Sequence, residues 1–334
     1  MKPALNNRAA LEIAEVFDLV RADLGQVEEE LGHQSDSGIE PVAAIARYLQ
    51  TGGGKRLRPA LHLLAAKFCG YEGPSAIQLG AVLELIHAAT LLHDDVIDSA
   101  DTRRGRASTN QRWGNSMTVL AGDWLYMQSF RIALAERNLR ILDVLIDLTQ
   151  QMVEGELVQL TRLGRADVSE EEALDISRRK TACLFSACME LGALLGAQPQ
   201  AETERLAGYG LNLGMAFQIV DDLLDLTADP ERLGKPVVND LREGKVTLPL
   251  VYALEAGGRA ARQKVELVLG ERGFVSVPSA EIVGLVRSSG AVERTHARAA
   301  DFIAQAYGCL EPFPDSVYRR ALASVPQFIL HRDY

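Results

Sequence analysis

Apolar residues recur at three- and four-residue spacing along almost the whole chain of 334 residues, whereas sustained alternation of apolar and polar positions is hard to find. The first pattern is typical of helices and the second of strands, so the sequence predicts an all-α fold. The expected helices are Arg8 to Leu31, Pro41 to Gln50, Leu57 to Cys69, Ser75 to Asp98, Ser116 to Glu136, Asn138 to Leu163, Ser169 to Gly196 and Ala201 to Asp225, followed by shorter ones toward Tyr334.

Glycine and proline pairs such as Gly73-Pro74 and Gly257-Gly258 stand between these segments and favour helix ends. Ser169 followed by three glutamates predicts a capping box. The helices Ser75 to Asp98 and Ala201 to Asp225 are apolar nearly all round, which is typical of central helices in a bundle. No Ser/Pro-rich linker separates two halves, so we expect one domain over 1–334, a bundle of roughly ten or more helices.

The composition is that of a soluble globular protein, with 47% hydrophobic and 24% charged residues. A net charge of -10 argues against general nucleic-acid binding. The N-terminus lacks the apolar region of a signal peptide, and no run approaches the roughly 20 apolar residues of a membrane span. Four cysteines without paired zinc spacing indicate core thiols in a reducing compartment, so we expect a cytoplasmic protein with no transmembrane segment.

One short acidic pattern occurs twice, as Asp94-Asp95-Val96-Ile97-Asp98 and as Asp221-Asp222-Leu223-Leu224-Asp225. On a helix its first, second and fifth positions lie at about 0°, 100° and 40°, so three carboxylates are expected on one face. Carboxylates about 5 Å apart repel by roughly 3 kcal/mol per pair at an effective dielectric of about 20, which a divalent cation would offset. Oxygen-only ligands favour Mg²⁺, which usually binds through carboxylates together with substrate phosphates.

Each acidic pattern follows an apolar helical run, so the acids are expected where a buried helix opens into a cavity, with the two acidic ends facing each other. A solvated acidic turn would explain either copy alone. It explains the repetition poorly.

Basic residues could supply the partners of a phosphate. The segment from Gly52 to Pro59 brings Lys55, Arg56 and Arg58 to a glycine-rich loop before a helix, although such a loop is more often a solvated turn and this one lacks the Lys-Ser/Thr of a nucleotide P-loop. Arg103 and Arg104 follow the first acidic cluster. Further polar candidates, each of which alone would be taken for a surface residue or a helix cap, are Lys180, Thr181, Gln218, Lys235 and Lys245.

His87 and Thr90 lie seven and four positions before Asp94, within about 40° of it on the helix face, and are expected to line the same cavity. A lone histidine in an apolar helix is more often a hydrogen-bonded core residue. The acid-bearing face instead favours diphosphate contact for His87, while His93 points elsewhere and is interpreted as structural.

These motifs together resemble the trans-isoprenyl diphosphate synthases, most closely the long-chain polyprenyl group of the octaprenyl type. The similarity runs nearly throughout the chain. Its matching segments are Gly53 to Pro59, Leu92 to Asp98, Arg103-Arg104-Gly105, Gly122-Asp123, Glu154-Gly155-Glu156, Lys180-Thr181, Phe217 to Asp225 and Gly244 to Pro249.

The resemblance implies a helical bundle around a deep central cavity, commonly a homodimer. It implies that Mg²⁺, about three ions with substrate bound, is held by Asp94, Asp95, Asp98, Asp221, Asp222 and Asp225. By the same resemblance, the allylic diphosphate is contacted by Arg103, Lys180, Lys235 and Lys245, and isopentenyl diphosphate by Lys55, Arg58, His87 and Arg104. Thr181 and Gln218 would face the developing carbocation. Asn239 departs from the pattern, because relatives often carry an acid there, which affects an outer metal-water contact.

The implied reaction is a Mg²⁺-dependent, head-to-tail condensation of isopentenyl diphosphate onto an allylic primer such as farnesyl or geranyl diphosphate. Metal and cations stabilise the departing diphosphate, the isopentenyl double bond attacks the allylic cation, and proton loss restores an alkene. No protein nucleophile is required, which agrees with the lack of an evident Ser/His/Asp or Cys/His set.

Small side chains near the first cluster favour a long product. Ala89 and Thr90 stand where short-chain members of the family carry aromatic residues, and Leu145 resembles the tunnel floor of long-chain members. The expected product is about C30 to C50, near C40, a length suited to a quinone side chain among other lipids. The alternative is that Ala89 and Thr90 are helix-packing residues.

Four other functions are alternatives. A shorter-chain geranylgeranyl or farnesyl diphosphate synthase would share the whole site. A non-catalytic subunit of a heteromeric synthase should have lost acids or basic partners. A class I terpene cyclase would not need a second, basic diphosphate pocket, and a scaffold without ligand would leave the repeated acids unexplained.

Overall fold

The computed structural model describes residues 11–35, 38–51, 56–103, 105–227 and 238–330. Three of the expected site residues, Lys55, Arg104 and Lys235, lie outside these ranges. The described residues are helical almost throughout, which confirms the predicted all-α class.

The elements follow one another along the chain with short connections. The helices are α1 (Ile13–Asp18), α2 (Arg21–Ser35), α3 (Glu40–Thr51), α4 (Leu57–Phe68), α5 (Ser75–Ile97), α6 (Thr109–Trp113), α7 (Asn115–Ala135), α8 (Leu139–Arg162), α9 (Glu170–Ser177), the π-helical segment η1 (Arg178–Ala182), α10 (Cys183–Leu195), α11 (Gln200–Thr227), α13 (Asn239–Arg242), α14 (Leu248–Glu271), α15 (Ser279–Ser288), α16 (Ala291–Leu310) and α17 (Val317–Leu330). Between α5 and α6, β1 (Thr102–Arg103) pairs antiparallel with β2 (Arg106–Ala107).

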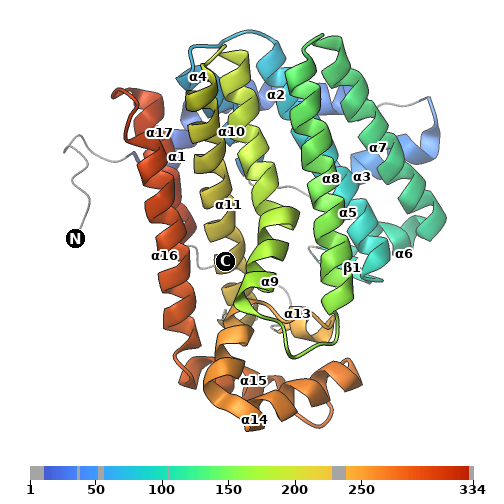
Figure 1. The fold of residues 1–334 in the computed structure, drawn as a ribbon. Coiled ribbons are helices and arrows are strands. Elements are labelled where there is room, and N and C mark those ends of the chain that lie inside the picture. Colours follow the sequence, from blue (N-terminus) through green and yellow to red (C-terminus); the bar gives the residue numbers. More distant parts are fainter. Residues whose placement is uncertain (1–10, 36–37, 52–55, 104, 228–237, 331–334) are drawn as a thin grey trace.

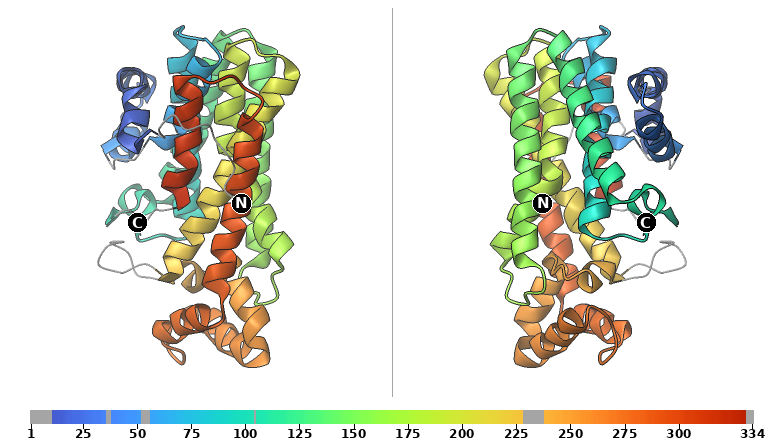
Figure 2. Two further views of the ribbon diagram at one scale, coloured as in Figure 1. Left: turned by 90° about the vertical axis from the view of Figure 1, so that its left-hand side faces the viewer. Right: turned by 90° about the vertical axis from the view of Figure 1, so that its right-hand side faces the viewer.

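The long helices stand side by side, with α11 in the middle of the bundle and α14 and α15 crossing its lower end (Figure 1). The two side views show the same elongated bundle, with α1, α2 and α3 outside its main body (Figure 2). Helix α11 packs against α10 and α16, α10 packs against α4, and α5 packs against α7. Most residues of the first four turns of α5 and one whole face of α11 are buried, as predicted for central helices.

Two glycines let α11 approach its neighbours closely. A Cβ on Gly210 would lie 2.3 Å from the Phe185 carbonyl oxygen, and one on Gly214 would lie 2.6 Å from the Cα of Ala182. Both glycines lie on one helix face, four residues apart, and Gln218 follows on that face after another four. The close approach therefore brings Gln218 beside the segment that carries Thr181.

The observed helices differ from the predicted ones near both ends of the chain. The expected helix Arg8 to Leu31 is wrong as one unit, because α1 ends at Asp18 and α2 begins at Arg21. Toward the C-terminus the expected shorter helices are present as α13, α15 and α17, with 4, 10 and 14 residues, whereas α16 spans 20 residues. The helix break expected at the glycine pair 257–258 is confirmed, because Gly258 has non-helical φ and ψ of 59° and -143°, and two helical parts of α14 meet there at a kink.

The capping box at Ser169 is confirmed, because the Ser169 side chain accepts a hydrogen bond from the Glu172 backbone and the Glu172 side chain accepts one from the Ser169 backbone. The small hairpin β1–β2 and the five-residue helix α6 were not predicted. Both are too short to produce a periodic pattern in the sequence.

Helix α5 corrects the expectation that no stretch approaches a membrane span. Among the described residues it is the one helix long and apolar enough to cross a bilayer, with a mean hydropathy of 1.5 in its most apolar window. Of that window, 61% is buried inside the protein. Its apolar character is that of a core helix.

Candidate active site

The first acidic cluster lies at the C-terminal end of α5, and its three carboxylates do not share one environment. Asp95 is 1% exposed. Its oxygens accept hydrogen bonds from the backbone and hydroxyl of Thr109, at 3.1 and 2.7 Å, and from Arg103 Nε at 2.6 Å. The expectation of three carboxylates on one face therefore needs correction, because the roughly 100° step to the second position turns Asp95 toward α6 and β1.

Asp94 and Asp98 are partly buried and lie close to cations. Burial raises the pKa of Asp94, and the carboxylates of Glu156 and Asp98 add to this, while Lys180 and Arg103 oppose it. Asp98 accepts a hydrogen bond from Lys245 at 3.0 Å. The first and fifth positions of the pattern thus face cations, as the roughly 40° offset between them predicts.

The second acidic cluster, at the end of α11, repeats this arrangement. Asp221 is exposed and Asp222 is buried. Asp222 accepts a hydrogen bond from Gln218 Nε2 at 2.7 Å. Asp225 accepts hydrogen bonds from the backbone N–H groups of Asn239 and Asp240, at 3.2 and 3.3 Å, which fixes the start of α13 against the end of α11.

Burial raises the pKa of Asp222 to about 7 and that of Asp225 to about 6, and repulsion from neighbouring carboxylates adds to both shifts. Burial also raises the pKa of Asp240 well above its ordinary value. These shifts indicate negative charges crowded into a poorly solvated region, where binding a cation would favour the ionised forms.

Thr181 and Gln218 form a relay to the second cluster. The Thr181 hydroxyl donates to Gln218 Oε1 at 2.7 Å, and Gln218 Nε2 donates to Asp222. Because both ends of the amide are used, its orientation is fixed, with the carbonyl toward Thr181. The two residues predicted to act together are in direct contact.

Lys180 lies on the π-helical segment η1, a type of distortion often found at functional sites. Gly155 on α8 makes room for it, since a Cβ there would lie 2.8 Å from Arg179 Cβ and 3.0 Å from the Lys180 backbone nitrogen. The two glutamates that flank Gly155 form ion pairs with successive residues of η1. Glu154 lies 2.6 Å from Arg179, and Glu156 lies 2.5 Å from Lys180.

The sequence motif Glu154-Gly155-Glu156 therefore packs against the η1 segment and holds it in place. The sequence analysis did not assign this role to the motif. The signal for it was a glycine between two acids in a helix, facing a basic pair in another helix. Thr109 and Glu243 are further contacts of the site that were missed, and nothing in their local sequence points to them.

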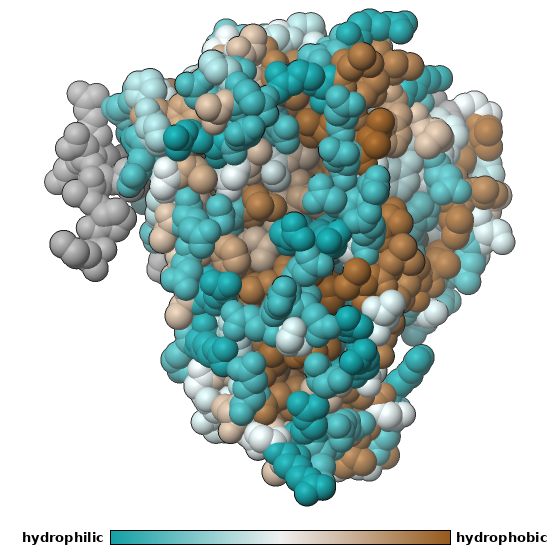
Figure 3. Space-filling model, viewed as in Figure 1, coloured by the Kyte–Doolittle hydropathy of each residue, from teal (hydrophilic) through white to brown (hydrophobic). Residues whose placement is uncertain are grey.

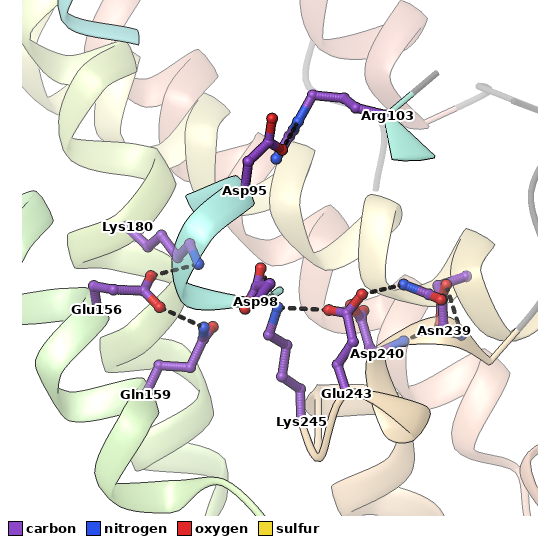
Figure 4. Close-up of polar contacts among 11 residues, drawn as sticks. Asp95, Asp98, Arg103, Glu156, Gln159, Lys180, Asn239, Asp240, Glu243 and Lys245 are labelled. Atoms are coloured by element: carbon purple, nitrogen blue, oxygen red, sulfur yellow. Dashed lines mark hydrogen bonds and ion pairs between the residues drawn. The ribbon is translucent and has the colours of Figure 1, made fainter. Parts of the chain in front are cut away.

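Lys245 connects the two acidic ends of the bundle. Its Nζ lies 3.0 Å from Asp98 and 2.7 Å from Glu243 (Figure 4). Burial alone would lower the pKa of Lys245, but Asp98 and Glu243 outweigh burial and raise it. Lys180 lies on the other side of Asp98 in the same view and is paired with Glu156 (Figure 4). Lys180 opposes the rise in pKa of both Asp94 on α5 and Asp222 on α11, so it lies close to both acidic helix ends.

A cavity of about 180 Å³ lies on the α11 side of this arrangement. The predicted site residues that line it are Lys180, Thr181, Gln218, Asp222 and Lys245. Of the other predicted residues in the described ranges, Asp221 and Asp225 lie at the end of α11, and Asp94, Asp95 and Asp98 lie at the end of α5.

Arg58 and His87, two of the residues predicted for a basic diphosphate pocket, are in contact. Arg58 Nη1 lies 3.0 Å from His87 Nε2, and the guanidinium carbon of Arg58 lies 5.5 Å from the centre of the Phe185 ring. A guanidinium group only donates, so His87 Nε2 accepts this hydrogen bond. Thr90 donates to the His87 carbonyl at 2.8 Å. Arg103, predicted for the allylic diphosphate, is paired with Asp95.

The residues expected to set product length lie in the core. Ala89 on α5 and Leu145 on α8 are 0% exposed, and Thr90 is half-buried. His93, interpreted as structural, packs against α7: its Nε2 lies 3.2 Å from the Val119 carbonyl oxygen, and Gly122 leaves room for the ring, since a Cβ there would lie 2.3 Å from that nitrogen.

Within the described residues, no three Asp, Glu, His or Cys side chains converge closely enough to hold a metal ion unaided. The available donors are carboxylate oxygens, and burial together with crowding raises the pKa of several of these carboxyl groups. This set fits Mg²⁺, which completes its coordination with water and substrate phosphate more readily than it occupies a cage made by protein alone.

Comparison with known proteins agrees with this geometry. A family model described as polyprenyl synthetase matches residues 39–281. Octaprenyl diphosphate synthase from Escherichia coli (strain K12) is 35% identical over 323 residues, with 97% of this chain and 100% of that protein covered. A short chain isoprenyl diphosphate synthase from Methanothermobacter thermautotrophicus is 36% identical over 325 residues, with 96% and 99% covered.

Among solved structures, a polyprenyl synthase from Caulobacter crescentus CB15 superimposes with a TM-score of 0.92 and 35% identity. The superposition covers 98% of this chain and 100% of that one. That crystal structure is a complex with calcium and isoprenyl diphosphate.

Proposed function

The chain belongs to the polyprenyl synthetase family and is a prenyltransferase, and from this premise we propose that it is a long-chain trans-polyprenyl diphosphate synthase. It condenses isopentenyl diphosphate head to tail with an allylic primer, farnesyl or geranyl diphosphate. The observation that carries the proposal is the meeting of the two acidic helix ends at Lys180 and Lys245 beside a cavity.

We infer that the six aspartates of the two clusters hold Mg²⁺, about three ions with substrate bound. When bound, Mg²⁺ supplies the positive charge that stabilises the departing diphosphate. The positions of Asp94, Asp98 and Asp221, which face cations or solvent, suit direct contact. Asp95 and Asp222 would have to exchange their present hydrogen bonds before they could coordinate an ion.

The allylic diphosphate is assigned to Arg103, Lys180, Lys235 and Lys245. Lys180 and Lys245 already sit among carboxylates at the cavity, so a diphosphate can take the place of their present partners without moving either ammonium far. As the carbon–oxygen bond breaks, these cations hold the negative charge that develops on the leaving group.

Thr181 and Gln218 are assigned to the allylic cation. The Gln218 carbonyl oxygen is held by its relay and lies at the cavity wall, where its negative end can stabilise positive charge on carbon. Because the relay fixes the amide before substrate arrives, no reorganisation is needed during the reaction.

Isopentenyl diphosphate is assigned to Lys55, Arg58, His87 and Arg104. The contact between Arg58 and His87 brings two predicted members of this pocket together from α4 and α5. The double bond of isopentenyl diphosphate attacks the allylic cation, and loss of a proton from the adduct restores an alkene.

We assign product length to Ala89, Thr90 and Leu145 and propose a product of about C30 to C50, because these side chains are smaller than the aromatic residues that would block a growing chain. The relatives include both octaprenyl and short chain synthases, so a geranylgeranyl or farnesyl product is the second candidate. The small size of Ala89 favours the longer product.

We further propose a single-domain, cytoplasmic homodimer without nucleic-acid partners. Apolar side chains are exposed along α7 and α8, among them Leu120, Met127, Leu139, Ile146 and Leu157. Brown patches mark this side of the surface in Figure 3. A second copy would cover such a surface, because exposed apolar patches of this kind usually mark an interface.

The test is incorporation of radiolabelled isopentenyl diphosphate by the purified chain, with farnesyl diphosphate as primer. The proposal predicts a long polyprenyl product that disappears with chelator and returns with Mg²⁺. A non-catalytic subunit, a terpene cyclase and a scaffold each predict no incorporation.

A further inference from the structure

Arg56 begins α4 in an unusual backbone conformation. It is the residue before the first helical turn, yet its φ and ψ are 47° and 34°, in the left-handed region. Residues in this position normally have extended geometry. A non-glycine residue remains in the left-handed region when its surroundings hold it there, often at a functional site.

Two carboxylates hold the Arg56 side chain. Nη1 donates to Glu84 Oε2 at 2.7 Å and Nη2 to Glu28 Oε2 at 3.0 Å, while Nε also donates to Glu28. The Glu84 side chain is 9% exposed and comes from α5, and Glu28 comes from α2. Arg56 thereby ties the start of α4 to two other helices and neutralises a buried charge.

This contact is one of two parallel links. Arg56 reaches Glu84 and, two residues later, Arg58 reaches His87, three residues further along α5. Residues three apart share a helix face, so both links join the start of α4 to the same side of α5. The position of Arg58 relative to His87 therefore depends on the link formed by Arg56.

We propose that Arg56 is a positioning residue for the isopentenyl diphosphate pocket and that it acts through Glu84, without itself binding phosphate. This inference rests on the proposed function. Three of its five N–H donors are taken by carboxylates, which a phosphate would have to displace. The neighbouring cation Arg58 is oriented toward His87 as a result.

The test is a double-mutant cycle of R56M and E84Q, with KM measured separately for isopentenyl diphosphate and for the allylic primer. Each single variant should raise the KM for isopentenyl diphosphate roughly ten-fold, as loss of a supporting contact commonly does, and leave the allylic KM within about two-fold. The double variant should be no worse than either single one, because one link has been removed in all three. R56K should recover part of the loss.

The control is R47M, which removes an exposed ion pair with Glu40 on α3 and should leave both KM values unchanged. A direct phosphate ligand predicts instead that R56M raises the KM while E84Q leaves it unchanged or lowers it. A purely structural role predicts lower thermal stability with no preferential change in either KM. Either result overturns the inference. If R56M fails to fold, R56K and E84Q make the same distinction. Absence of incorporation by the unmodified chain would refute the proposed function instead.

Discussion

Lys245 and Asp98 lie 3.0 Å apart, although 147 residues separate them in the chain. Asp98 ends the first acidic helix, and Lys245 follows the short helix that is fastened to Asp225 at the end of the second. The pair therefore couples the two acidic ends across the opening of the site. It also keeps an ammonium group where a substrate diphosphate is proposed to bind.

Replacing Lys245 with methionine should lower kcat at least about 100-fold, because a preorganised cation at the leaving group is lost. The measurement is steady-state incorporation of isopentenyl diphosphate, with the fold checked by circular dichroism. K264M is the matched control, since it removes an exposed pair with Glu281 on the surface and should leave kcat unchanged. A K245M enzyme with normal kcat would remove Lys245 from the proposed mechanism.

Substituting Gly155 with alanine should displace the η1 segment, because the new Cβ would lie 2.8 Å from Arg179 Cβ. We expect a loss of roughly 1–3 kcal/mol in the free energy of unfolding from overpacking, together with a lower kcat as Lys180 moves. The measurements are chemical denaturation and steady-state rate.

The control for this substitution is G284A on α15, where nothing lies within 4 Å of the added Cβ. There alanine should stabilise by roughly 0.5–1 kcal/mol, since it is the better helix former. Equal effects of the two substitutions would contradict the conclusion that Gly155 makes room for the η1 segment.

The metal-free protein should become less stable as pH rises from about 4 to about 7. The pKa of Asp222 is about 7 in the folded chain and near 4 in the unfolded chain, so the folded state binds more protons in this window. Stability from such a group is fully present below the unfolded pKa and is lost as pH rises through the folded pKa. Mg²⁺ should therefore raise Tm more at pH 8 than at pH 5.5.

The measurement is Tm against pH with and without Mg²⁺, for the parent chain and for D222N. Comparison with the variant is needed because His62 changes the stability with pH in the opposite direction. Burial lowers the pKa of His62 to about 4, so its contribution to the stability of the folded state is lost as pH falls. D222N should flatten the slope between about pH 5 and 7. If the metal-free parent and D222N have the same slope, Asp222 does not carry the predicted linkage.

Replacing Ala89 with phenylalanine should shorten the product, because an aromatic ring five residues before Asp94 would block the growing chain. Chromatography of the dephosphorylated product gives its length. A88F, on the neighbouring half-buried position, is the control for a bulky residue in the same turn. A full-length product from A89F would show that Ala89 does not gate the tunnel.

The sequence predicted the central helices because helical periodicity repeats every few residues. Arg58 and His87 were grouped by resemblance to a known family, and their direct contact is a finding of the structure. The orientation of Asp95 could not be predicted, since its partner Thr109 lies on a five-residue helix with no pattern of its own. The break in α14 at Gly258 was predicted because a glycine pair is a local signal, and Gly258 has a non-helical backbone at positive φ.

The π-helical turn at Lys180 likewise could not be predicted from the local sequence. It depends on the missing side chain of Gly155 and on ion pairs with α8, all of which are long-range. The acidic clusters were predicted because the same pattern occurs twice. The contact of Asp95 with Thr109 is tertiary and has no local signal, whereas Asp222 is hydrogen-bonded to Gln218 one turn earlier on the same helix.

The most direct test of the account is an anomalous diffraction measurement on crystals grown with Mn²⁺ and an unreactive thiolo analogue of farnesyl diphosphate. Manganese peaks should lie between the α5 and α11 carboxylates, within bonding distance of Asp94 or Asp98 on one side, of Asp221 or Asp225 on the other, and of the analogue's phosphates. Peaks confined to the outer surface, with the diphosphate bound away from both acidic helix ends, would contradict the account.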